Sequence, residues 1–171
     1  MTTDTVRHII WFVVLVASQV LVFNNIGFVG LINPFPYIYL LIIMPDNFKG
    51  LGALALGFLF GLTLDMFMDT GGMHASGCTF LVFVRPFILR NISSVDGYGD
   101  VMTPSANQQG LSWFISYAAI LVGLHHIWLF YFEIFRFEEF FQTLFRALGS
   151  WFSTLIIVVI LQIFTDSSKK R

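Results

Sequence analysis

Long uncharged stretches alternate with short polar ones along this chain. Residues 8–45, 50–64, 110–132 and 147–165 contain no Asp, Glu, Lys or Arg. A membrane-spanning helix needs about 20 mostly apolar residues, so the first stretch is long enough for more than one crossing. The pattern predicts an all-α integral membrane protein with about six transmembrane helices in one compact bundle. These helices are expected at about residues 8–31, 34–45, 50–68, 74–90, 111–132 and 143–164.

The second of these crossings has two possible forms. Asn33-Pro34-Phe35-Pro36 interrupts the helical pattern, because proline has no N–H and disfavours helical geometry in the residue before it. Residues 37–44 are too short to cross a bilayer by themselves. They form either half of a tilted crossing that also uses residues 26–32, or a re-entrant piece buried among the other helices.

Composition narrows the class of protein. The chain of 171 residues is 57% hydrophobic and 11% charged, with a mean hydropathy of +0.81, which indicates a single polytopic membrane domain over residues 1–171. A net charge of −1 gives no basic patch for nucleic acid. Cys78 is the only cysteine, so no disulfide can form within the chain. The N-terminal apolar run resembles a signal peptide, but apolar residues resume at Val20, so we expect a retained first helix.

The distribution of basic residues predicts the orientation. Cytoplasmic loops of membrane proteins are enriched in Lys and Arg. With both termini in the cytoplasm, only Arg136 and Arg146 lie outside. The other seven lie on or towards the inner side: Arg7, Lys49, Arg85, Arg90, Lys169, Lys170 and Arg171. We therefore expect a multi-pass protein with an even number of crossings and both termini cytoplasmic.

Small residues follow one face of the third predicted helix. Ala53, Gly57, Gly61 and Asp65 recur every four residues, and such a stripe lets a neighbouring backbone approach closely. The stripe is either a packing seam inside this protein or a seam for a partner helix. A carboxylate in a membrane should face the bundle and have a partner. For Asp65 the candidates near the outer turn are His74 and Asp69, and we favour structural pairing over proton or ion chemistry.

Other polar residues have simpler interpretations. Pro86 is expected to kink the fourth helix, while Arg85 and Arg90 anchor it at cytoplasmic headgroups. The adjacent residues His125 and His126 point about 100° apart on a helix, which does not suit one metal ion. One of the two is expected to hydrogen-bond inside the bundle.

The outer segment 130–141 is rich in aromatic residues interleaved with charges. This composition suits an interfacial belt, and it could also dock a partner protein through Phe135, Arg136, Phe137 and Phe140. No catalytic set, metal site or cofactor motif stands out in the chain. The sequence therefore predicts no enzyme.

Several segments together resemble the MreD family of bacterial rod shape-determining membrane proteins. Three of them are NPFPYIYLLIIMP, FVRPFILR and YAAILVGLHHIWLFYFE. The fourth contains Gly57, Gly61 and Asp65 and continues to Gly72, His74 and Ala75. The likeness runs in order from about Ile9 to Phe164. It implies a non-enzymatic subunit of the cell-elongation complex in the bacterial inner membrane. Such proteins act with MreC, and more widely with MreB, RodA and a transpeptidase penicillin-binding protein in peptidoglycan synthesis.

The resemblance also implies a fold like that of the substrate-binding subunits of energy-coupling-factor vitamin transporters. One hypothesis is that the glycine seam shapes a cleft near Asp65 where the membrane anchor or outer segment of MreC rests. The competing hypothesis is a substrate-binding membrane subunit of a small-solute transporter, which predicts a pocket with a few convergent polar groups.

Overall fold

The computed structural model describes residues 2–25, 32–45, 50–92, 104–134 and 140–168. Within them the chain is helical: α1 (Thr2–Ser18), the π-helix η1 (Gln19–Phe23), α2 (Ile38–Ile42), α3 (Gly50–Met68), α4 (Met73–Ile92), α5 (Ala106–Gln109), α6 (Leu111–Ile134) and α7 (Phe140–Ser168). Among the described residues, five helices are long and apolar enough to span a membrane, namely α1 continued by η1, α3, α4, α6 and α7.

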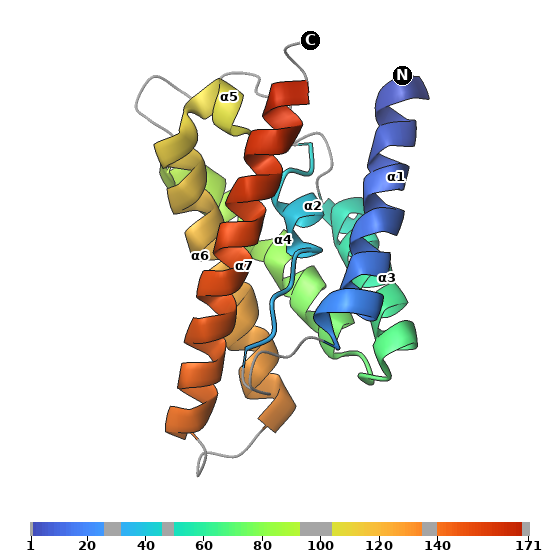
Figure 1. The fold of residues 1–171 in the computed structure, drawn as a ribbon, viewed down its shortest axis with the longest axis vertical. Helices are drawn as coiled ribbons and strands as arrows, with labels where there is room; N and C mark the ends of the chain where they lie inside the picture. The colour runs from blue at the N-terminus through green and yellow to red at the C-terminus, as the bar shows by residue number, and fades with distance from the viewer. Residues whose placement is uncertain (1, 26–31, 46–49, 93–103, 135–139, 169–171) are drawn as a thin grey trace.

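The long helices form a bundle in which α4 packs against α3 and α6, and α6 packs against α7 (Figure 1). The start of α1 and the end of α7 lie at the same end of the molecule. The outward faces of these helices carry large apolar side chains such as Val13, Phe67 and Phe145, which are more than half exposed and suit a lipid environment.

The second predicted crossing, residues 34–45, is not a long helix. Residues 33–35 are not helical, residues 36 and 37 form a turn, and only the five residues of α2 follow as helix. Residues 34–39 are all buried, and the segment rises beside α7 through the bundle (Figure 1). The segment is buried among the other helices, and the choice between the two forms depends on residues 26–31, which lie outside the described residues. A sixth crossing made in this way stays a proposal.

Hydroxyl groups of α7 satisfy the backbone of this segment. Pro34 and Pro36 have no N–H, so residues 33–36 carry only the N–H groups of Asn33 and Phe35. These donate to Ser150 Oγ and Thr154 Oγ1, both at 2.9 Å. Ser150 and Thr154 are four residues apart on α7, so they lie on the same face of the helix and accept from both backbone donors of residues 33–36.

The other end of the segment is capped from α4 and α6. A helix end leaves its last carbonyl groups without partners within the helix. The hydroxyl of Tyr117 donates to Ile42 O at 3.1 Å, and the Arg85 guanidinium donates to Tyr117 Oη at 3.0 Å and to Met44 O. A buried non-helical segment thus obtains the hydrogen bonds that lipid cannot supply.

Removing one α7 hydroxyl should destabilise the bundle. Thr154→Val keeps the side-chain shape but leaves the Phe35 N–H without an acceptor, so we expect the free energy of unfolding to fall by about 1–3 kcal/mol. Thr63→Val is the matched control, because the Thr63 hydroxyl donates to Leu59 O within its own helix. Detergent-denaturation curves of the two variants test this. Equal stability of both would contradict the assigned role of Thr154.

The stripe of small residues on α3 faces α4. A Cβ on Gly57 would lie 2.9 Å from Val82 Cγ2, and a Cβ on Gly61 would lie 2.5 Å from the Cα of Ala75. Ala53, on the same face, is also buried. Of the two possibilities for the stripe, the structure has the packing seam within the protein. Gly57 and Gly61 are therefore not available to a partner helix.

Candidate functional site

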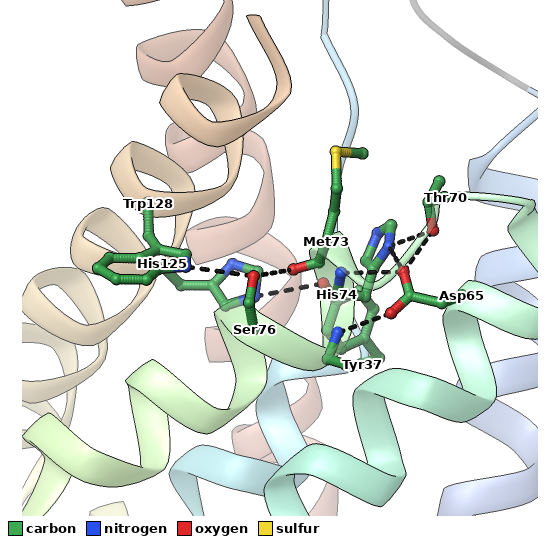
Figure 2. A network of polar contacts seen from close by, with 9 residues as sticks. Tyr37, Asp65, Thr70, Met73, His74, Ser76, His125 and Trp128 are labelled. Atoms are coloured by element: carbon green, nitrogen blue, oxygen red, sulfur yellow. Dashed lines mark hydrogen bonds and ion pairs between the residues drawn. The ribbon is translucent and has the colours of Figure 1, made fainter. Parts of the chain in front are cut away.

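The most concentrated polar site of the described residues surrounds the Asp65 carboxylate (Figure 2). Asp65 lies near the end of α3 and is 5% exposed. Its Oδ1 accepts hydrogen bonds from Thr70 Oγ1 at 2.5 Å, the His74 backbone N–H at 3.0 Å and His74 Nδ1 at 3.1 Å. Its Oδ2 accepts from the Ala75 N–H at 2.8 Å. The carboxylate therefore has hydrogen bonds on both oxygens.

This arrangement caps α4 from a neighbouring helix. The first four N–H groups of a helix lack intrahelical acceptors, and a negative charge is favourable there. In α4 the Met73 N–H donates to Thr70 O and the Ser76 N–H donates to Gly72 O. The two N–H groups between them, those of His74 and Ala75, donate to Asp65. The acid that ends the small-residue stripe thus completes the start of the next helix.

The missing side chain of Gly61 and the carboxylate of Asp65 both serve the contact between α3 and the start of α4. Gly61 lies one helical turn before Asp65, and its missing side chain is filled by the backbone of His74 and Ala75. Only this close approach of α4 to α3 brings the N–H groups within reach of the carboxylate. The turn between the helices has positive φ at Asp69, Gly71 and Gly72.

The sequence predicted a polar pairing of Asp65, Asp69 and His74. The structure brings Asp65 and His74 together in a side-chain contact of 3.1 Å. Asp69 is exposed and occupies the turn with φ of 54° instead of contacting that pair. Because a carboxylate oxygen can only accept, the contact assigns a proton to His74 Nδ1. The partner that the sequence did not predict is Thr70, five residues after Asp65.

The two adjacent histidines of α6 are both fully buried. His126 Nδ1 lies 2.8 Å from Val122 O, and its Nε2 lies 3.1 Å from Thr154 Oγ1. His125 Nε2 lies 3.3 Å from the hydroxyl of Tyr37. Sequence reasoning expected one of the pair to bond inside the bundle, and both do. It missed Tyr37 and Thr154, since nothing local in the sequence shows that residues 33–37 reach α6 and α7.

Arg85 is not the headgroup anchor that the sequence predicted. It is 2% exposed and bonds to the end of α2 and to Tyr117, because those buried carbonyl groups need a donor. Pro86 lies inside α4, and Arg90 is exposed in its last turn, so Arg90 remains placed to reach headgroups. Nothing local in the sequence distinguishes an arginine that anchors a helix at headgroups from one that donates to buried carbonyl groups.

The predicted outer partner surface is only partly described. Phe135, Arg136 and Phe137 lie outside the described residues. Phe140 begins α7, is partly exposed, and packs against Tyr131 and Phe141 with ring centroids 5.7 and 5.6 Å away. The use of this surface by a partner stays a prediction.

The hydrogen bonds of Asp65 give this site a structural role. Both oxygens of Asp65 accept hydrogen bonds from protein donors, three at Oδ1 and one at Oδ2. Among the residues that the structure describes, no three His, Cys, Asp or Glu side chains are placed to hold a metal ion. Comparisons of the chain with protein-family models, curated proteins and solved structures find no match. The contacts of Asp65 join the end of α3 to the start of α4.

Proposed function

We propose that this chain is a non-enzymatic membrane scaffold subunit of the bacterial cell-elongation complex. In this role it contacts MreC in the inner membrane, with RodA, a transpeptidase penicillin-binding protein and MreB in the wider complex. It thereby helps to maintain rod shape and to organise peptidoglycan synthesis. The observation that carries the proposal is the resemblance to the MreD family, which runs in order along nearly the whole chain.

The contacts made by the residues that carry the resemblance support a scaffold. Gly57 and Gly61 pack α3 on α4, Asp65 caps α4, and Arg85 caps α2. Each of these residues joins two elements within the protein, which supports a structural use of the small and polar positions. α4 occupies the glycine seam, which is the tight packing that the hypothesis expects, and a cleft near Asp65 for the membrane anchor or outer segment of MreC stays a prediction. The outer segment 130–141 is a second proposed place of contact with MreC.

The filling of the bundle centre also favours a scaffold over a solute carrier. A carrier of the transporter class needs a pocket with a few convergent polar groups. Here Phe35, Tyr37 and Ile38 are nearly or fully buried where residues 34–39 pass through the bundle. These buried side chains fill the bundle along the segment, which favours the scaffold proposal over the carrier.

Co-purification tests the proposal. With a tag on this chain, MreC should be recovered from detergent-solubilised membranes of its own host. Arg136→Glu, on the predicted outer surface, should lower the recovery of MreC several-fold without changing thermal stability, because arginine side chains contribute strongly to protein interfaces. Arg90→Glu is the matched control, since it reverses an exposed arginine in the last turn of α4, the end that the distribution of basic residues predicts to be cytoplasmic.

Two outcomes would reject the proposal. One is failure to recover MreC with the unaltered chain under conditions that keep the protein folded. The other is recovery of a bound vitamin-like molecule together with a partner ATPase module, which would favour the transporter class. Equal loss of MreC from both arginine variants would reject the outer surface as the contact.

A further inference from the structure

Three buried polar atoms beside residues 34–37 have no hydrogen-bond partner among the described residues. They are Gln19 Oε1, His74 Nε2 and His125 Nδ1. Their side chains are 1%, 2% and 0% exposed, respectively. They come from three separate elements, η1, α4 and α6.

All three side chains contact residues 34–37, the segment that leads into α2. Gln19 Nε2 donates to Pro34 O at 3.4 Å, and His125 Nε2 lies 3.3 Å from the Tyr37 hydroxyl. The His74 ring packs edge-on against Tyr37, with ring centroids 5.8 Å apart. Figure 2 shows His74, His125 and Tyr37 gathered near the start of α4. The unsatisfied atoms are therefore a local feature of this segment.

Leaving a buried polar atom without a hydrogen-bond partner is unfavourable, so three of them around one segment indicate missing partners. Buried polar groups without protein partners are normally bound by internal water, which makes two to four hydrogen bonds. Non-helical backbone at membrane depth is found where protein covers it or where it faces water. We propose that ordered water molecules bind beside residues 34–37, to Gln19 Oε1, His74 Nε2 and His125 Nδ1.

Water fits the chemistry of this set better than an ion does. The glutamine oxygen can only accept a hydrogen bond, whereas a ring nitrogen either donates or accepts according to its tautomer. Water can satisfy both kinds of atom. A bound transition metal would need three or four ligands, and the described residues place no such group together. In this account, water links η1, α4 and α6 to the buried segment.

The four histidines of the chain supply a test that needs no substitution. His8 is exposed near the start of α1 and serves as the hydrated reference. His126 is fully buried next to His125, but both of its ring nitrogens contact protein acceptors or donors, so it serves as the dry reference. The two remaining histidines carry the unpaired nitrogens.

The experiment is solid-state NMR of the full chain in lipid vesicles with ¹⁵N-labelled histidine, measuring the transfer of magnetisation from water to each ring nitrogen. We expect His74 Nε2 and His125 Nδ1 to receive magnetisation from water at the same mixing times as His8. The transfer to them should be several-fold faster than the transfer to the ring nitrogens of His126. Transfer as slow as that of His126 at both positions would overturn the proposal.

Discussion

Gly61→Ala is expected to destabilise the protein more than any other single methyl addition on α3. The new Cβ would lie 2.5 Å from the Cα of Ala75, and backbone atoms cannot move aside as the end of a flexible side chain can. Overpacking a well-packed site costs about 1–3 kcal/mol and occasionally more, and we expect this variant at or above the upper end. Moving α4 away would also pull the His74 and Ala75 N–H groups from Asp65.

The same helix provides a graded series for this prediction. Gly52→Ala meets no atom within 4 Å and is expected to be neutral or stabilising, by up to about 1 kcal/mol of helix propensity. Gly57→Ala meets Val82 Cγ2 at 2.9 Å and should fall between the two, because a side-chain methyl can shift. Detergent-denaturation midpoints should therefore decrease from Gly52→Ala through Gly57→Ala to Gly61→Ala. Equal midpoints for the first and last variants would contradict the seam.

Asp65→Asn is expected to have the second large effect. The amide has the same shape but replaces one acceptor oxygen by an NH₂ group, which would then face a protein donor such as the Ala75 N–H. Loss of the charge also weakens the remaining bonds at the start of α4. We expect the free energy of unfolding to fall by at least about 2 kcal/mol, measured by the same denaturation curves.

Asp69→Asn is the matched control for that variant. It is the same substitution of aspartate by asparagine, made four residues later. Asp69 is exposed and lies in the turn, and asparagine tolerates the positive φ of that position. We expect it to leave stability within about 0.5 kcal/mol of the unaltered protein. If Asp65→Asn were as mild as Asp69→Asn, the capping role of Asp65 would be refuted.

The long helices follow from local sequence because apolar length determines them. The predicted ranges 50–68, 74–90 and 111–132 lie close to α3, α4 and α6. The contact between Asp65 and His74 was also within reach of sequence reasoning, since only a tight turn separates the two helices. The role of the carboxylate as a cap was not, because it depends on how closely α4 approaches Gly61.

The path of residues 34–45 and their hydrogen-bond partners could not be predicted from the local sequence. Pro34 and Pro36 indicate where a helix cannot form, but they do not indicate what satisfies the backbone instead. The acceptors are Ser150 and Thr154, more than a hundred residues away in sequence. The role of Arg85 was hidden for the same reason, because its acceptors lie on a segment whose path the sequence left open.

The measurement that tests the scaffold proposal most directly is the shape of host cells in which this chain is depleted. The account predicts that rod-shaped cells round up, and that the unaltered chain and Gly52→Ala restore rods while Gly61→Ala does not. Cells that stay rod-shaped after complete depletion, and lose uptake of a small solute instead, would contradict it.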